Sequence, residues 1–227
     1  MTDQDIRLEA RGPSLASQVH GALIEMLLSG ELAPDDRISM RDLADRLGVS
    51  VMPVREAVAR LAAQDALVVL PNRAVTVPLL SRDEFRDLTE VRIHNERHAV
   101  ALAAAQVGPR DLIRVRNLEQ QFADALEAPD GGPSVRANKA LHFAVYEAAN
   151  SPVLCAVIRS LWLKAGPIIN LDLEERTRRR RTAVSRAHHA SLIDALARGD
   201  AEAAADAVEA DIRSAAEFIL SRDILPA

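Results

Sequence analysis

Apolar residues between positions 38 and 63 recur at helical spacing in two short runs. The first run ends at Gly48, a residue that permits the sharp turn needed after a helix. The second run begins after Ser50, which can cap a helix, and contains Pro53, which a first helical turn tolerates. Its apolar residues form one stripe: Val54, Ala57, Val58 and Leu61. The pattern predicts two helices joined by a tight turn, a helix-turn-helix.

Two β-rich runs follow the helix pair, LVVL at 67–70 and VTVP at 75–78. The intervening PNRA predicts a hairpin with Arg73 at its tip. A helix-turn-helix followed by such a hairpin is a winged helix. Because an amphipathic helix is also expected at about 14–29, the predicted domain covers residues 14–78.

Beyond the hairpin the pattern changes to long helices. Ser81 and Glu84 have the form of a capping box, and the Gly-Pro pair at 166–167 is predicted to end the fourth of these helices near residue 165. The expected helices cover about 82–106, 111–127, 134–149, 152–165, 185–198 and 200–221. Short connections between six helices predict a bundle.

The predicted fold class is therefore mainly α, and 227 residues suffice for two cores. A composition of 48% hydrophobic but only 3% aromatic residues suits Ala- and Leu-rich helices. The predicted parts are a flexible arm at 1–13, a winged helix at 14–78, a linker at 79–81, an all-α bundle at 82–222 and a tail at 223–227.

The net charge of −5 hides a basic segment. Residues 37–73 contain six arginines and four acids, which gives +2 locally. With Cys155 as the only cysteine, no intrachain disulfide is possible, and a reducing compartment is expected. The sequence shows neither a signal pattern nor an apolar run of membrane length, so we expect a cytoplasmic protein.

A helix-turn-helix can present its second helix to the major groove of DNA. Arg55 lies outside the apolar stripe of that helix and is the best-placed base reader. Short helix pairs are also ordinary packing units in all-α proteins, so the spacing alone leaves both interpretations open. The predicted hairpin with Arg73 favours DNA.

Residues 14–78 resemble the DNA-binding domain of the GntR superfamily of bacterial transcription regulators, chiefly through GVSVMPVREAVARL. The resemblance implies that four residues contact operator DNA: Arg41, Ser50, Arg55 and Arg73. Operator palindromes match symmetric proteins, so we expect a homodimer formed through the helical half.

Residues 82–222 resemble the FCD ligand-binding domain of the FadR-like branch of the same superfamily. The segments that carry the resemblance are EVRIHNE, NKALHFAVYEAANSP and HASLIDALARGDAEAA. Many FCD domains hold a divalent metal with an Asp and a His four residues apart and two further His. The corresponding residues here are Asn138, His142, His189 and Asp211.

The carboxylate has thus moved from the first ligand position to the fourth. Two imidazoles and one carboxylate suit Zn, Ni or Mn. Without the resemblance, these residues are more typical of ordinary helix faces, although Asn138 and His142 share one face. His188 leaves a one-residue alternative for the third ligand.

Arg92 matches the pocket-lining arginine of the first FCD helix, which implies a role in binding an acidic effector. The alternative is a solvent-facing partner of Glu96 one helical turn away.

The sequence therefore predicts a non-enzymatic transcriptional regulator, a repressor, whose operator affinity is controlled by a small organic acid bound in a metal-containing bundle. One alternative is a metal-dependent enzyme with an accessory winged helix, because two His and an Asp can activate water. Another is a winged helix that binds protein.

Overall fold

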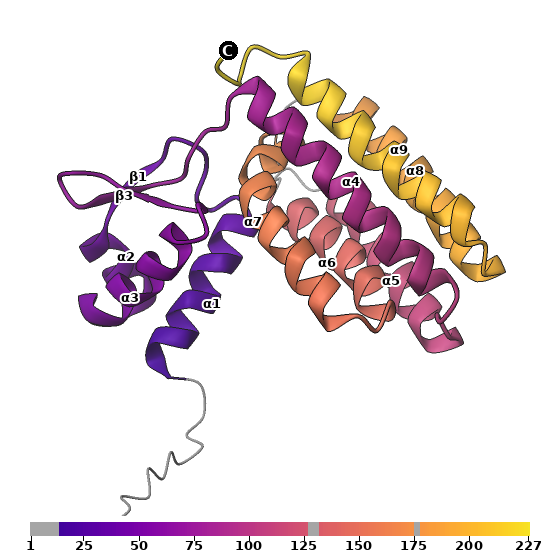
Figure 1. Cartoon of the computed structure of the whole chain (residues 1–227), viewed down its shortest axis with the longest axis horizontal. Helices are drawn as coiled ribbons and strands as arrows, with labels where there is room; N and C mark the ends of the chain where they lie inside the picture. Colours follow the sequence, from indigo (N-terminus) through magenta and orange to yellow (C-terminus); the bar gives the residue numbers. More distant parts are fainter. Residues whose placement is uncertain (1–13, 127–131, 175–177) are drawn as a thin grey trace, which may run out of the picture.

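The computed structural model describes residues 14–126, 132–174 and 178–227, and the predicted arm at 1–13 lies outside them. The described elements are α1 (Leu15–Leu28), β1 (Arg37–Ser39), α2 (Met40–Leu47), α3 (Val51–Ala62), β2 (Val68–Val69), β3 (Ala74–Thr76), α4 (Arg82–Ala104), α5 (Pro109–Leu126), α6 (Gly132–Ala148), α7 (Pro152–Glu174), α8 (Arg178–Arg198) and α9 (Ala201–Leu220). The predicted fold class is confirmed: a winged helix precedes a helical bundle (Figure 1).

The winged helix packs α1, α2 and α3 around an apolar core. The predicted stripe of α3 is buried, and Leu23, Leu27 and Leu43 of the other two helices pack with it. Gly48 ends α2 with φ of 65°, a left-handed conformation that glycine adopts without strain. Ser50 occupies the N-cap position of α3, but its side chain forms no capping hydrogen bond there, contrary to the prediction.

The wing belongs to a three-stranded antiparallel sheet of order β1-β3-β2. β1 was not predicted because three residues are too few to show an alternating pattern. Its Ile38 lies opposite Val75 of β3, and both side chains are buried. At the hairpin turn, the amide of Arg73 donates to the carbonyl of Leu70 over 2.8 Å. Burial of the β1–β3 pair anchors the hairpin to the helices.

The bundle is built on α4, which packs against α6, α7 and α9, while α5 packs against α6 and α8. The predicted capping box is present at its start: the amide of Ser81 donates to Glu84 Oε2 over 2.8 Å, and the Ser81 side chain accepts from the amide of Glu84. The tail packs as well, because the amide of Arg82 donates to the carbonyl of Pro226 and Leu225 is buried.

The predicted break at residues 166–167 is wrong, because α7 continues through Gly166 and Pro167 to Glu174. A proline inside a helix loses one backbone hydrogen bond, so tertiary contacts must compensate. Ile168 is buried beyond the break, and the Asn170 side chain donates to the carbonyl of Leu27 over 3.3 Å. Contacts with α1 and the bundle core therefore override the local signal.

The segment Pro152–Asn170 of α7 is long and apolar enough to span a membrane, with a mean hydropathy of 1.4. Its apolar residues have another explanation, because Ile158, Trp162 and Ile168 are buried in the protein core. The segment also carries charge at Lys164. We therefore interpret it as a core helix.

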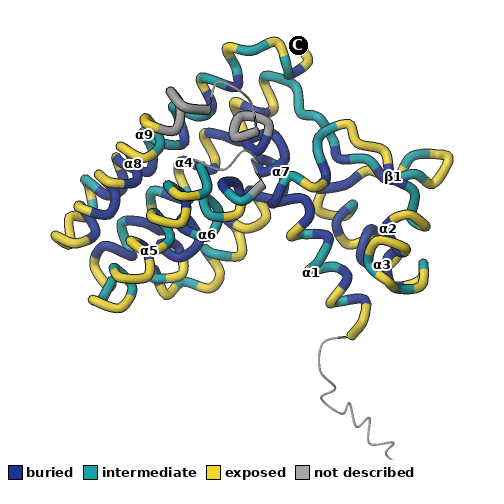
Figure 2. The backbone as a smooth tube through the Cα atoms, turned by 180° about the vertical axis from the view of Figure 1, so that it is seen from behind, coloured by how far each residue is buried: buried dark blue, intermediate teal, exposed yellow. Residues whose placement is uncertain are grey.

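The two domains share one continuous core at the contact of α1 with α7. Figure 2 shows buried backbone on both sides of this junction. Polar contacts join the same domains: Lys139 of α6 pairs with Glu25 of α1, and Lys164 of α7 pairs with Asp65 over 3.0 Å. The bundle is thus attached directly to the winged helix.

Candidate functional site

The predicted DNA-contacting residues all lie exposed on the winged helix. Arg41 lies in the first turn of α2, Ser50 precedes α3, Arg55 lies near the N-terminal end of α3 and Arg73 lies at the wing turn. None of the three guanidinium groups forms an ion pair with another residue in the described part of the chain. Their charge is therefore available to phosphates and base edges.

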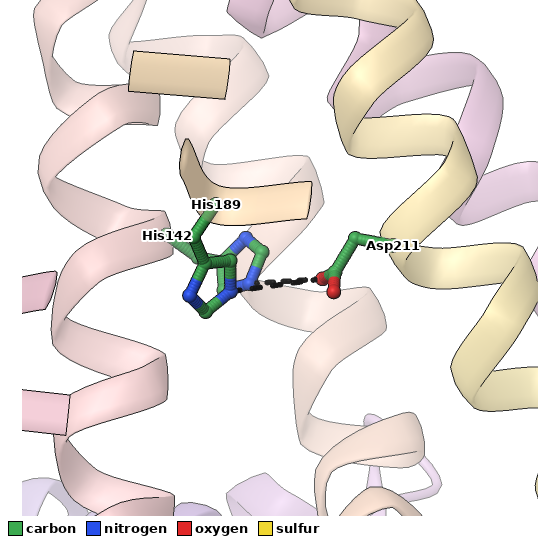
Figure 3. A group of neighbouring side chains, drawn as sticks. All are labelled: His142, His189 and Asp211. Carbon is green, nitrogen blue, oxygen red and sulfur yellow. Dashed lines mark ion pairs between the residues drawn. The ribbon is translucent and has the colours of Figure 1, made fainter. Parts of the chain in front are cut away.

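The structure brings His142 of α6, His189 of α8 and Asp211 of α9 together in the bundle (Figure 3). One potential ligand atom from each lies within 4.8 Å of the other two. His142 Nε2 is 3.3 Å and His189 Nε2 is 4.0 Å from Asp211 Oδ2. The buried cluster combines two imidazole nitrogens and one carboxylate oxygen.

Burial favours His189 over His188 at the third position. The side chain of His189 is fully buried and faces His142, with their ring centroids 5.2 Å apart, whereas His188 is half-buried. Asn138 lies one helical turn before His142 and is also half-buried. Its side chain forms no hydrogen bond with another described residue, so its predicted role as a weak or outer ligand stays a prediction.

Each histidine of the cluster is held through its other ring nitrogen. His189 Nδ1 is 2.8 Å from Glu119 Oε2, and Arg186 Nε donates to the second oxygen of the same carboxylate over 3.1 Å. His142 Nδ1 is 3.1 Å from the Tyr146 hydroxyl. Partners of this kind orient metal-binding histidines in proteins.

Glu96 of α4 is the centre of a buried hydrogen-bond network below the cluster. Its carboxylate accepts from Arg92 Nε over 2.8 Å, from Trp162 Nε1 over 3.1 Å and from the Tyr146 hydroxyl. The predicted pair of Arg92 with Glu96 therefore exists, but it does not face solvent: the two residues are 5% and 0% exposed. The guanidinium also lies 5.0 Å from the centroid of the Trp162 ring.

Sequence reasoning missed Glu119, Tyr146 and Glu96 as site residues. Tyr146 follows His142 by four positions, a helical spacing that provides a signal. Glu119 has no such signal, because α5 meets α8 only through the tertiary fold.

Electrostatics favour a cation between the three side chains. Burial raises the pKa of Asp211, but the hydrogen bond from His142 and the charge of His189 outweigh it and bring the pKa to about 2. For His189, burial lowers the pKa, yet the hydrogen bond to Glu119 and the charge of Asp211 raise it above its ordinary value. The cluster thus holds a carboxylate anion that attracts a positive charge to the imidazoles.

The donor set fits a divalent metal. His189 Nε2 is buried without a hydrogen-bond partner among the described residues, an unusual state for a polar atom unless it binds something. Two nitrogens and one oxygen match the preferences of Zn, Ni and Mn. Two ligands about 2.1 Å from one ion are roughly 3.0 to 3.4 Å apart, which is the separation of His142 Nε2 from Asp211 Oδ2.

A winged helix joined to an all-α domain with a buried His, His and carboxylate cluster defines a class of DNA-binding regulators. The sequence-family model for bacterial regulatory proteins of the gntR family matches residues 15–77. The sequence-family model for the FCD domain matches residues 87–214. The chain therefore belongs to the GntR family of transcriptional regulators, in its FadR-like branch with an FCD domain.

Known relatives agree with this assignment. The HTH-type transcriptional regulator McbR of Escherichia coli is 36% identical over 154 residues, which are 68% of this chain and 70% of McbR. The structure of E. coli McbR/YncC has a TM-score of 0.86 at 30% identity and covers 92% of this chain and 98% of its own. The HTH-type transcriptional repressor GlaR of E. coli is 30% identical over 82 residues, 36% of this chain and 37% of GlaR.

A GntR transcriptional regulator from Rhodococcus sp. RHA1 shares the fold, with a TM-score of 0.74 at 24% identity over 91% of this chain and 97% of its own. The winged helix and the bundle are thus combined in the same order in other regulators.

Proposed function

We propose that this regulator is a cytoplasmic homodimeric repressor whose operator affinity depends on a small carboxylate bound at a divalent metal in the bundle. The observation that carries the proposal is the buried Nε2 of His189 beside His142 and Asp211, which has no hydrogen-bond partner in the part of the chain that the structure describes. The name of GlaR, a repressor, supports the direction of control.

His142, His189 and Asp211 would hold the metal, with Asn138 as a weaker or outer ligand. When bound, the ion supplies an electrophilic centre for a carboxylate oxygen of the effector. Arg92 lies at the far end of the Glu96 network, where its guanidinium is paired with Glu96, and we propose that it contributes to the binding of an acidic effector.

The site reaches the DNA-binding domain through two helices. α6 carries His142 and, one turn earlier, Lys139, which pairs with Glu25 of α1. α7 carries Trp162, which binds Glu96, and Gly166, which packs against Leu28 of α1. An effector that binds one arrangement of α6 and α7 more tightly than another therefore changes DNA affinity. The size of the change is limited by the difference between the effector's binding free energies for the two arrangements.

Arg55, Arg41, Ser50 and Arg73 are the residues that we propose contact the operator. Their exposure on the helix-turn-helix and the wing supports this assignment. The transcriptional-regulator names of the relatives favour this function over a metal-dependent enzyme.

Metal uptake by chelator-treated protein, prepared without a polyhistidine tag, tests the proposal. We expect one Zn, Ni or Mn per chain, and we expect His142→Ala to abolish uptake. Asp211→Ala should weaken binding more than Asn138→Ala, whereas Asn138→Asp should keep or strengthen it because negative charge favours a dication. Absence of saturable uptake by the wild-type protein would remove the metal from the proposal.

The same preparations should be titrated with operator DNA and small carboxylates. We expect a carboxylate to shift operator affinity in the metal-loaded wild type and to lose this effect in His142→Ala. If both proteins responded equally, effector binding would have to occur away from the metal.

A further inference from the structure

We propose that Tyr146 and Glu119 are positioning residues: each accepts the Nδ1–H of one site histidine and thereby turns the Nε2 lone pair of that ring toward Asp211. The inference rests on the metal site proposed above. The new elements are the tautomer of each site histidine and the residue that fixes that tautomer.

The direction of the hydrogen bonds at His142 follows from Glu96. A carboxylate has no proton to donate, so the Tyr146 hydroxyl must donate to Glu96. A hydroxyl has only one proton, so the Tyr146 oxygen can only accept from His142 Nδ1. The neutral ring of His142 then carries its lone pair on Nε2, and the 3.3 Å contact of that atom with Asp211 Oδ2 is a hydrogen bond only when the ring is doubly protonated.

Arg92 and Trp162 make this arrangement stable. Both donate to the Glu96 carboxylate, and the guanidinium supplies a full positive charge next to it. Glu96 is fully buried, so it would be costly as an anion without these donors. All donors in this network, namely Arg92, Trp162 and the Tyr146 hydroxyl, therefore point toward the Glu96 carboxylate, and His142 Nδ1 donates to the hydroxyl oxygen.

The same argument applies more simply to His189. Glu119 is a carboxylate that accepts from Arg186. Since a carboxylate has no proton to donate, His189 Nδ1 must be the donor in its hydrogen bond with Glu119. The lone pair of His189 is then on Nε2, the buried atom for which residues 14–126, 132–174 and 178–227 provide no hydrogen-bond partner. At 4.0 Å, Asp211 is too distant to hydrogen-bond that atom.

The two networks present two nitrogen lone pairs to one carboxylate. Electron-rich atoms that face one another in this way attract a positive charge, either a proton on a ring nitrogen or a metal ion, and a protein that fixes both rings before the metal arrives loses less rotamer freedom on binding. Positioning partners of this kind typically change metal affinity by about 10- to 100-fold when removed.

Zinc titration of chelator-treated protein provides the first test, with Tyr146→Phe, Glu119→Ala and Glu119→Gln beside the wild type. We expect Tyr146→Phe and Glu119→Ala each to weaken zinc binding by about 10-fold or more. Glu119→Gln should recover part of the loss, because its amide oxygen still accepts from Nδ1. Glu147→Ala is the matched control, since Glu147 adjoins Tyr146 but pairs with Arg114 on the surface, and it should bind zinc like the wild type.

Ring ¹⁵N shifts give a readout that a merely structural role would not change. In metal-free wild-type protein, at a pH where both rings are neutral, we expect the proton of His142 and His189 on Nδ1. In Tyr146→Phe, the His142 ring should shift toward the Nε2–H tautomer, in which it can donate to Asp211. A wild-type His142 with its proton on Nε2 would overturn the inference.

The outcomes separate the two proposals. If wild-type protein takes up no zinc, the metal site itself fails. If the wild type binds zinc and both Tyr146→Phe and Glu119→Ala bind it equally well, the site stands and the positioning role is wrong. Circular dichroism of each metal-free variant identifies a loss caused by unfolding, and in that case the Glu119→Gln titration and the wild-type tautomer decide.

Discussion

Replacing Glu96 by methionine is expected to destabilise the protein far more than replacing a surface glutamate. The substitution keeps side-chain length but leaves the guanidinium of Arg92 buried without its carboxylate, since the two side chains are 6% and 0% exposed. It also removes the acceptor for Tyr146 and Trp162. Breaking a buried ion pair on one side costs about 3 to 5 kcal/mol.

For a chain of this size, each kcal/mol corresponds to a change of about 2 to 4 °C in the melting temperature, so we expect a decrease of roughly 6 to 20 °C. The measurement is thermal unfolding followed by circular dichroism, in the presence of a chelator so that metal binding does not contribute. Glu147→Met is the matched control on an exposed pair with Arg114, and it should cost about 0 to 1 kcal/mol.

The double variant Arg92→Met/Glu96→Met distinguishes a buried charge from simple loss of packing. Because it removes both charges, we expect it to be no less stable than Glu96→Met alone. Additive losses in the double variant, or a Glu96→Met variant within about 1 kcal/mol of the control, would refute the interpretation of this network.

Three further predictions concern DNA binding, assembly and the domain junction. Arg55→Ala should lower specific operator affinity by about 1 to 3 kcal/mol per half-site in fluorescence anisotropy, while Arg73→Ala should act more weakly and to a similar extent on random DNA. Sedimentation should give twice the chain mass of 24.7 kDa, and a monomer at micromolar concentration would contradict the proposed dimer. Gly166→Ala should cost about 1 to 3 kcal/mol, because an added Cβ would lie 2.9 Å from Leu28 Cδ2. Its control, Gly21→Ala in open space on α1, should not destabilise the protein.

The elements whose cause is local could be predicted from the sequence. The apolar stripe of α3, the glycine that ends α2 and the capping box of Ser81 with Glu84 depend on neighbouring residues, so spacing and residue type suffice to predict them. The order of a winged helix and a bundle could be predicted for the same reason. Family resemblance then related residues that spacing alone could not connect, including His142, His189 and Asp211.

Features that depend on partners far away in the sequence became visible only in the folded chain. Gly166 and Pro167 have the local signature of a helix end, yet α7 continues because contacts with α1 stabilise it. β1 exists because β3 provides the strand beside it. A hydrogen bond across the chain has no periodicity in the sequence, and this is why Glu119 could not be predicted as the partner of His189.

The pair of Arg92 and Glu96 shows most directly what residue spacing can and cannot predict. Helical spacing predicted that the two side chains meet, but spacing is the same for a surface pair and a buried pair. Whether they face solvent depends on which helices cover them, and here Trp162 of α7 and Tyr146 of α6 do so. The contact was local and could be predicted from the sequence, whereas its burial, and hence its energy, was determined by the packing of the bundle.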